Sequence, residues 1–218
     1  MSQLSNENPL GQQKSGSKIG MMILAAGAST RMGKPKQLLL HRGQTLLRSA
    51  VETAVASLCR PIVVVIGAHA ELVKEELEHL PILVVENREW EKGMSSSIRI
   101  GLDALVDTCA KLDGVVIMLC DQPFVTAGVI NSLVEAHRKT GKIIVTSSYR
   151  ETRGVPAFFS RQLFGEIAAL ESNEGARQVI ANHSDAVAAI YFPEGTVDVD
   201  TPGDYEALSQ RKPLVQVT

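Results

Sequence analysis

Short apolar runs alternate with segments of helical periodicity over most of this 218-residue chain. Runs of this kind are typical of strands that are buried on both faces of a parallel sheet. The apolar runs predict strands at residues 19–24, 61–66, 82–85, 114–119 and 143–146. The amphipathic segments predict helices at residues 44–58, 70–79, 95–110 and 126–139. This alternation predicts βαβ units, and therefore a three-layer α/β fold with helices on both faces of a mostly parallel central sheet.

The last third of the chain has a different pattern. Residues 154–159 predict a strand in which the proline takes an edge or entry position, because proline cannot donate a ladder hydrogen bond. Helices are expected at 160–170 and 174–182, and a strand at 187–192. Pro202 is expected at the first position of a final helix. We expect mixed strand directions here, and a wall that completes a cleft.

Composition and charge narrow the class of protein. Hydrophobic residues make up 44% and aromatic residues 4% of the chain, as in globular α/β proteins rich in aliphatic residues. The net charge of −2 creates no global field for nucleic acid or an anionic membrane, so an anionic ligand must be held by local chemistry. Three cysteines without metal spacing, and no apolar stretch of membrane length, favour a cytoplasmic protein. Residues 1–17 are polar and lack the apolar core of a signal peptide, so we expect a disordered tail before a single domain at 18–218.

The first apolar run ends in a loop of small residues, at positions 25–30, that is followed by three cations. Small residues let the backbone approach a ligand closely, so that consecutive N–H groups can converge on an anion. The cations are Arg31, Lys34 and Lys36. Cations directly beyond such a loop indicate that the anion is a polyphosphate, whereas the alternative is a plain strand–loop–helix turn with surface charge.

Two common phosphate-binding motifs do not fit this loop. A Walker A loop needs four residues between its glycines and a Ser or Thr after its lysine. Here Gly27 and Gly33 enclose five residues, and Pro35 follows Lys34. The dinucleotide motif G-x-G-x-x-G is also absent, because Ser29 stands where its second glycine would be.

Asp121 follows the predicted strand 114–119 after a single intervening residue. In open α/β sheets ligands bind outside the carboxyl ends of the strands, so Asp121 and the loop at 25–30 are expected on the same rim. Mg²⁺ takes one or two protein carboxylates and completes its coordination with phosphate oxygens and water. The other interpretation of Asp121 is an N-cap or Asx-turn before Pro123.

Three further segments carry polar residues that could complete a site. Asp198 and Asp200 share one side of an extended segment and could bind metal, although Asp200 or its neighbour Thr201 could simply cap the following helix. Three serines at 95–97 offer donors and acceptors at a helix start, with an ordinary Ser N-cap as the alternative. Arg177 near a helix start suits a phosphate, or is a solvated surface arginine.

Taken together, these motifs resemble the MobA-like NTP transferases, and within them the molybdenum cofactor cytidylyltransferases of the MocA type. The matching segments are LAAGASTRMGKPKQ at 24–37, GMSSSIRIGL at 93–102, CDQP at 120–123, RGVPAFF at 153–159, NEGAR at 173–177 and DVDTPGD at 198–204. The resemblance therefore covers almost the whole chain after residue 17.

The resemblance implies a Rossmann-like nucleotidyltransferase fold of the GT-A-like type, with Mg²⁺ as cofactor. It implies nucleotide binding by Leu24, Ala25, Ala26, Gly27, Ser29, Arg31, Lys36 and Ser97. The expected catalytic residues are Arg31, Lys36 and Asp121, and the expected metal ligands are Asp121 and Asp200. The acceptor is expected at Arg153, Gly154, Pro156 and Arg177. In this family Ala-Ala-Gly in the first loop accompanies cytosine, which favours CTP.

The expected reaction is an in-line displacement in which the phosphate of a molybdopterin-type acceptor attacks the α-phosphorus of CTP and pyrophosphate leaves. Residues 18–125 would bind the NTP and residues 126–210 the acceptor. Two alternatives remain at this point. One is a nucleotidyltransferase that activates a sugar phosphate or alditol phosphate. The other is a non-enzymatic maturation factor for a client molybdoenzyme.

Overall fold

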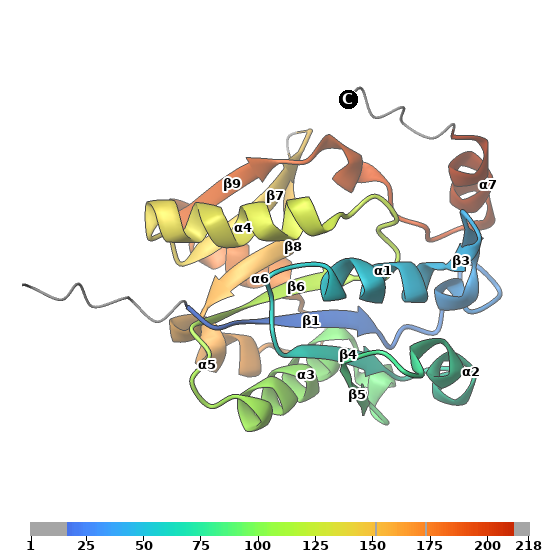
Figure 1. The fold of residues 1–218 in the computed structure, drawn as a ribbon, viewed down its shortest axis with the longest axis horizontal. Helices are drawn as coiled ribbons and strands as arrows, with labels where there is room; N and C mark the ends of the chain where they lie inside the picture. The colour runs from blue at the N-terminus through green and yellow to red at the C-terminus, as the bar shows by residue number, and fades with distance from the viewer. Residues whose placement is uncertain (1–16, 151, 173, 212–218) are drawn as a thin grey trace, which may run out of the picture.

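The computed structural model describes residues 17–150, 152–172 and 174–211. Within them, a seven-stranded sheet has the order β5-β4-β1-β6-β8-β7-β9 (Figure 1). Its strands are β1 (Ile19–Ala25), β4 (Ile62–Ile66), β5 (Leu83–Glu86), β6 (Gly114–Leu119), β7 (Ile144–Tyr149), β8 (Thr152–Ser160) and β9 (Val187–Tyr191). Strand β8 runs antiparallel to both β6 and β7, whereas the other pairings are parallel. The mostly parallel α/β sheet and the mixed directions in the last third are confirmed.

Alternate side chains of the strands divide the core between the two faces of the sheet. In β1, Met21 and Ile23 pack with one set of helices, and Met22 and Leu24 pack with the other. The first face is covered by α1 (Leu46–Val55), α2 (Ala70–Lys74) and α4 (Ala127–Thr140). The second face is covered by α3 (Met94–Thr108), α5 (Phe164–Ala168) and α6 (Ala176–Asn182) (Figure 1). The strands read as continuous apolar runs because both of their faces are buried.

A third, smaller apolar cluster joins the beginning of the chain to its end. It contains Met32, Leu39, Leu46, Val199 and Leu208. These residues come from the segment after β1, the start of α1, and the region around α7 (Pro202–Gln210). The backbone N–H of Val199 also donates to the carbonyl of Asp121 at 3.1 Å. The cluster therefore fixes the acidic segment before α7 against the loop after β1.

Several helices are shorter than the periodicity predicted. The helix predicted at 44–58 begins only at Leu46, because β3 (Gln44–Thr45) pairs with β2 (Leu40–His41) in a small hairpin. The segment predicted as a helix at 70–79 forms α2 and then a 3₁₀ turn at Glu75–Leu77. Helical geometry does not continue to Leu80, because a residue that precedes a proline, here Pro81, disfavours it. The segment at 160–170 likewise divides into a 3₁₀ turn at Arg161–Leu163 and α5.

The expected edge position of the proline in 154–159 is wrong, because β8 lies in the interior of the sheet. The strand tolerates Pro156 because the register with β7 shifts there: Thr146 pairs with Ala157, and Ser147 pairs with Gly154. The shift leaves Pro156 without a ladder partner, so its missing N–H costs no hydrogen bond. The pairing of β8 with β6 also stops at Ala157.

Further expectations concerned the helix ends, membrane-spanning segments and the N-terminal residues. Pro202 occupies the first position of α7, as predicted, and Thr201, one of the two residues considered for that role, caps this helix. Thr126 caps α4. Across the described ranges 17–150, 152–172 and 174–211, no helix has both the length and the apolar character needed to cross a membrane. The predicted disordered tail at 1–17 lies, apart from Ser17, outside the described residues.

The tight packing of β6 gives a test of the fold. A methyl group at Gly114 would collide with the Phe158 ring and the carbonyl oxygen of Phe159. We expect Gly114→Ala to lower the free energy of unfolding by about 2 kcal/mol, as for other overpacked cores, measured by urea denaturation. Gly165→Ala is the matched control, because no atom lies within 4 Å of its added methyl group and α5 favours alanine. Equal effects of the two substitutions would contradict this packing.

Candidate functional site

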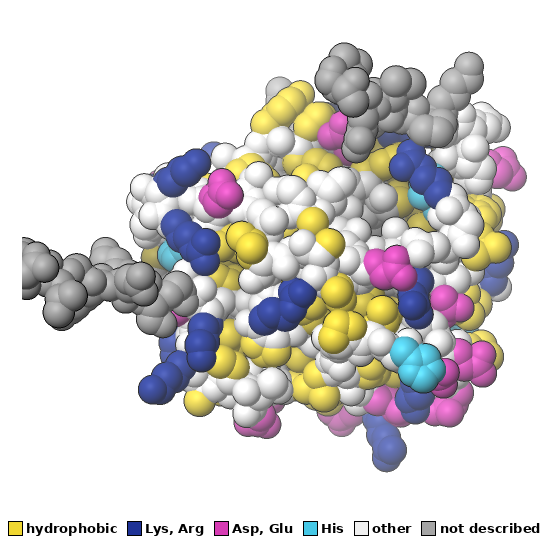
Figure 2. Space-filling view, viewed as in Figure 1, with side chains coloured by type: hydrophobic (Ala, Val, Ile, Leu, Met, Phe, Trp, Pro, Cys, Tyr) yellow, Lys and Arg dark blue, Asp and Glu magenta, His cyan; other side chains and the backbone are white. Residues whose placement is uncertain are grey.

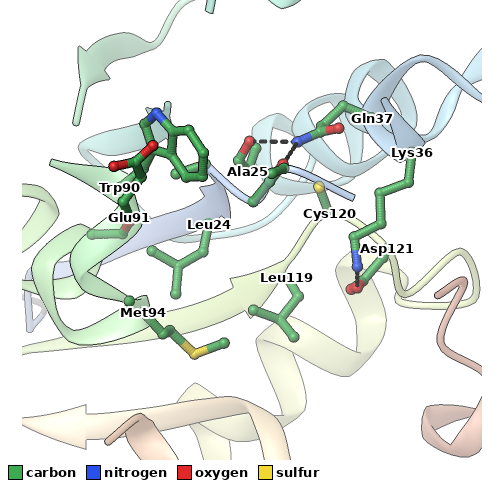
Figure 3. Close-up of a pocket in the computed structure, with 15 residues that line it drawn as sticks. Leu24, Ala25, Lys36, Gln37, Trp90, Glu91, Met94, Leu119, Cys120 and Asp121 are labelled. Atoms are coloured by element: carbon green, nitrogen blue, oxygen red, sulfur yellow. Dashed lines mark hydrogen bonds and ion pairs between the residues drawn. The ribbon is translucent and has the colours of Figure 1, made fainter. Parts of the chain in front are cut away.

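A buried glutamine organises the loop that follows β1. Gln37 is fully buried, and its Nε2 donates to the carbonyl oxygens of Ala25 and Gly27, both at 2.8 Å (Figure 3). The Ser29 hydroxyl donates to Gln37 Oε1 at 3.3 Å and accepts the backbone N–H of Lys36 at 3.1 Å. Ser29 itself adopts the left-handed conformation, with a φ of 56°. These bonds hold the loop in one shape, and sequence analysis gave Gln37 no role in it.

The loop forms one wall of a cavity of about 350 Å³ at the carboxyl ends of β1 and β6. Leu24, Trp90, Met94 and Leu119 supply apolar walls (Figure 3). Gly27 is exposed there, and a Cβ atom added at this position would have open space around it, with nothing within 4 Å. Its bare backbone therefore leaves open space for a ligand to approach closely. The remaining lining residues are Ala25, Ala26, Ala28, Lys36, Gln37, Glu91, Gly93, Ser97, Cys120 and Asp121.

Four of the predicted site residues meet in one cluster of charges. The ammonium group of Lys36 contacts Asp121 Oδ2 (Figure 3) and donates to Asp200 Oδ1 at 2.8 Å. Arg31 Nη2 lies 2.9 Å from Asp200 Oδ2. Asp200 does not cap α7, because the Thr201 hydroxyl accepts the first-turn N–H. The carboxylate of Asp200 is therefore available to the two cations of the loop.

Burial and pairing shift the pKa values in this cluster. The Lys36 side chain is only 16% exposed, and burial by itself lowers its pKa, but the charge and hydrogen bond of Asp121 outweigh burial and raise the pKa above its ordinary value. Burial raises the pKa of Asp200, but the hydrogen bond from Lys36 and the charges of Lys36 and Arg31 bring it below its ordinary value. Burial and the charge of Asp121 raise the pKa of Asp198. Lys36 therefore remains an ammonium ion at neutral pH.

The cluster fits a divalent cation. Asp121 Oδ1 is buried and has no hydrogen-bond partner among the described residues, although a carboxylate oxygen in such a place normally has one. Mg²⁺ needs only one or two protein carboxylates, because phosphate oxygens and water complete its coordination. This agrees with finding, in the described part of the chain, no group of three or more His, Cys, Asp or Glu side chains that could hold a metal ion. Asp121 and Asp200 are the residues that could hold the cation.

A second cavity of about 460 Å³ adjoins the first and shares Leu24, Met94 and Leu119 with it. Arg177, which was predicted to bind the acceptor, lines this cavity. The other lining residues are Ile117, Gln122, Tyr149, Val155, Glu174, Gly175, Ala176, Gln178, Asp198 and Asp200. The two cavities therefore meet over shared apolar side chains.

The other three predicted acceptor residues lie around this second cavity and do not line it. Gly154 is buried behind the Tyr149 hydroxyl, with which an added methyl group would collide. Arg153 is exposed and Pro156 is buried in β8. Gln122 was not predicted as a site residue, but it is buried, and its Nε2 donates to the Val155 carbonyl at 3.1 Å and to Asp198 at 3.3 Å. Asn173 of the motif at 173–177 lies outside the described residues.

Comparisons with known proteins identify the family and the fold. The family model described as the MobA-like NTP transferase domain matches residues 21–187. The purine catabolism protein PucB of Bacillus subtilis is 29% identical over 198 residues, which is 85% of this chain and 93% of that protein. A crystal structure of Rv0371c from Mycobacterium tuberculosis, in complex with manganese, superposes with a TM-score of 0.73 at 28% identity and covers 90% of this chain and 100% of that one.

A third relative is similar over a shorter segment. The nicotine blue oxidoreductase of Paenarthrobacter nicotinovorans is 37% identical over 118 residues, which is 54% of this chain. The match spans 56% of that protein, so this chain corresponds to about half the length of that relative. The similarity therefore concerns one segment of that protein.

The role of Gln37 can be tested directly. We expect Gln37→Leu to lower the free energy of unfolding by roughly 2 kcal/mol, because it leaves the carbonyl oxygens of Ala25 and Gly27 without their donor. Nucleotide affinity should fall as well, measured through the fluorescence of Trp90, the single tryptophan of the chain, which lines the cavity. Gln44→Leu, which changes an exposed glutamine bonded to Glu52, should alter neither quantity appreciably. An unchanged affinity in Gln37→Leu would show that the loop does not need this residue.

Proposed function

The chain belongs to the MobA-like NTP transferase family, and we propose that it transfers CMP from CTP to the phosphate of a molybdopterin-type cofactor, with release of pyrophosphate. It is a nucleotidyltransferase by family, whereas the nucleotide and the acceptor belong to the proposal. The observation that carries the proposal is a cluster of charges beside the small-residue loop: Lys36 and Asp121 line the first cavity, and Asp200 contacts both Lys36 and the more exposed Arg31. Cations for a triphosphate and carboxylates for a divalent metal stand within contact distance of each other there.

The triphosphate is assigned to the loop after β1. The exposed backbone at Gly27 provides close approach, and Lys36 and Arg31 provide positive charge beside it. The raised pKa of Lys36 keeps this group charged throughout the physiological range. Both cations already contact Asp200, so the charges that would neutralise phosphate oxygens are positioned before the substrate binds.

The metal is assigned to Asp121 and Asp200, with Mg²⁺ as the proposed ion. Family members normally use a divalent metal, and the related Rv0371c structure is a complex with manganese. When bound, a divalent ion supplies charge neutralisation at the phosphate oxygens. Asp121 Oδ1 has no hydrogen-bond partner within the described part of the chain, which supports this assignment, since a metal ligand must retain a free lone pair.

The proposed reaction is an in-line displacement. An oxygen of the acceptor phosphate forms a bond to the α-phosphorus of CTP, and the bond from that phosphorus to the bridging β-phosphate oxygen breaks, so that pyrophosphate carries away the electron pair. The acceptor phosphate is already ionised at neutral pH, so no general base is needed. Lys36 and Arg31 stabilise the negative charge that develops on the phosphate oxygens.

The acceptor is assigned to the second cavity, which shares Leu24, Met94 and Leu119 with the first. Arg177 lines this cavity and offers an exposed guanidinium to a phosphorylated acceptor. We thus propose that residues 18–125 bind the nucleotide and that residues 126–210 bind the acceptor, together with the shared apolar side chains and with Ile117 and Gln122. The first cavity is lined only by residues 24–121, which supports this division.

Nucleotide and acceptor choice are tested with a panel of substrates. CTP with Mg²⁺ should raise the melting temperature more than GTP or ATP does, because a ligand that binds only the folded state stabilises it more the more tightly it binds, at equal ligand concentration. Pyrophosphate release from CTP should require a molybdopterin-type acceptor. A larger shift with GTP would overturn the cytidylyl assignment. Turnover with a sugar phosphate or alditol phosphate, but not with molybdopterin, would overturn the acceptor.

The metal assignment is tested with Asp121→Asn. We expect the rate of pyrophosphate release to fall about a hundredfold, because the divalent ion loses its buried anionic ligand. Mn²⁺ affinity, followed by electron paramagnetic resonance, should fall in the same variant. Asp107→Asn, which changes an exposed carboxylate of α3, is the control and should leave both measurements unchanged. Unaltered Mn²⁺ binding in Asp121→Asn would remove Asp121 from the metal site.

A further inference from the structure

A buried asparagine connects the end of β5 to the first turn of α3. Asn87 is only 3% exposed, and its Nδ2 donates to the hydroxyls of Ser96 at 2.8 Å and Ser97 at 2.9 Å. Its Oδ1 accepts the backbone N–H of Glu89 at 3.0 Å. A backbone N–H can only donate, so the amide atom facing it must be the oxygen. The orientation of the Asn87 amide is therefore fixed, and both serine hydroxyls accept a hydrogen bond from it.

The two serines differ in what they do with their own protons. The Ser96 hydroxyl donates to the carbonyl of Gly93 at 2.7 Å, so its donor and its acceptor are both used within the protein. The Ser97 hydroxyl accepts from Asn87, and among the described residues it makes no hydrogen bond as a donor. Ser97 lines the cavity beside the β1 loop, whereas Ser96 does not. The Ser97 hydroxyl can therefore donate a hydrogen bond to a ligand in the cavity.

No helix cap competes for this donor. Helix α3 begins at Met94 after Gly93 and has no side-chain N-cap, so the alternative that one of the serines caps the helix is wrong. The side chains of Leu24, Met94 and Leu119 line the same cavity and offer no strong hydrogen-bond acceptor. A donor in such surroundings favours a ligand that presents an acceptor and disfavours one that does not, because an unmatched polar group loses its solvation.

We propose that Asn87 is a positioning residue that sets the hydrogen-bonding polarity of Ser97, so that Ser97 donates to an acceptor atom on the edge of the nucleobase. In a cytosine ring the 2-oxo group or the N3 atom provides such an acceptor. This inference rests on the proposed function, since it places the base of the nucleotide in this cavity. Asn87 itself acts only through Ser97 and does not line the cavity.

The test reverses the polarity with little change in shape. In Asn87→Asp the carboxylate can only accept, so the Ser97 hydroxyl donates its hydrogen bond to the carboxylate and presents a lone pair to the base. We expect CTP affinity to fall roughly tenfold, the effect of one hydrogen bond, while the affinity for inorganic tripolyphosphate stays unchanged. Isothermal titration calorimetry measures both ligands. An equal loss for CTP and tripolyphosphate would indicate general damage and overturn the inference.

Two further variants separate positioning from structure. Ser96→Ala removes the other hydroxyl partner of Asn87 and should retain CTP affinity, whereas Ser97→Ala should lose it. Adding Asn87→Asp to Ser97→Ala should cause no further loss of CTP affinity, because Asn87 acts through the hydroxyl that is already absent. Fully additive losses would contradict the inference. If Asn87→Asp does not fold, equal losses in Ser96→Ala and Ser97→Ala would contradict it instead.

The parent protein distinguishes this inference from the function on which it rests. If the parent protein binds tripolyphosphate at least as tightly as it binds any nucleotide, the assignment of the cavity to a nucleobase is wrong. If it binds CTP more tightly and Asn87→Asp leaves that preference intact, the proposed function stands and only the role of Asn87 falls.

Discussion

The contact of one ammonium group with two carboxylates holds the site together. Lys36 comes from the loop after β1, Asp121 from the end of β6, and Asp200 from the segment before α7. Charges this far removed from water are costly unless they are paired, and removing one partner leaves the others uncompensated. The three segments must therefore meet for the buried ammonium of Lys36 and the buried carboxylate of Asp121 to be paired. Arg31, which is 69% exposed, adds to the cluster from the solvent side.

Buried amides carry out the finer positioning around that cluster. Gln37 closes the β1 loop, Asn87 connects β5 with α3, and Gln122 connects the end of β6 with Val155 and Asp198. An amide suits this task because it donates and accepts at once, without the desolvation cost of a charge. Each amide joins segments that are distant in sequence or in different elements. The site is thus held by polar groups that are neutral and by one charged cluster at its rim.

The division of the strand side chains between two faces explains why the two cavities adjoin. Leu24 and Leu119 stand opposite one another in the pairing of β1 with β6, at the carboxyl ends of both strands. Both residues line both cavities. A ligand in the first cavity and a ligand in the second would therefore be separated by little more than these side chains, which is the proximity that transfer between two substrates requires.

The sequence by itself determined the parts of this protein that depend on local chemistry. Apolar runs identified β1, β4 and β6, small residues identified the loop after β1, and the position of Asp121 directly after an apolar run placed it on the rim of the sheet. These features could be predicted because periodicity and turn chemistry act over a few neighbouring residues. The resemblance of the motifs to a known family added the fold, since the motifs extend over most of the chain.

Only the tertiary structure decided which distant residues meet. The sequence allowed Asp200 to be either a helix cap or a metal ligand. In the structure the small apolar cluster that contains Val199 and Leu208 places Asp200 next to Lys36. The sequence also could not show that Pro156 lies inside the sheet, because that position depends on a register shift between β7 and β8. Contacts of this kind arise from the order of the strands and the packing between elements. A side chain carries no local mark of a partner that lies more than a hundred residues away, as Asp200 does from Lys36.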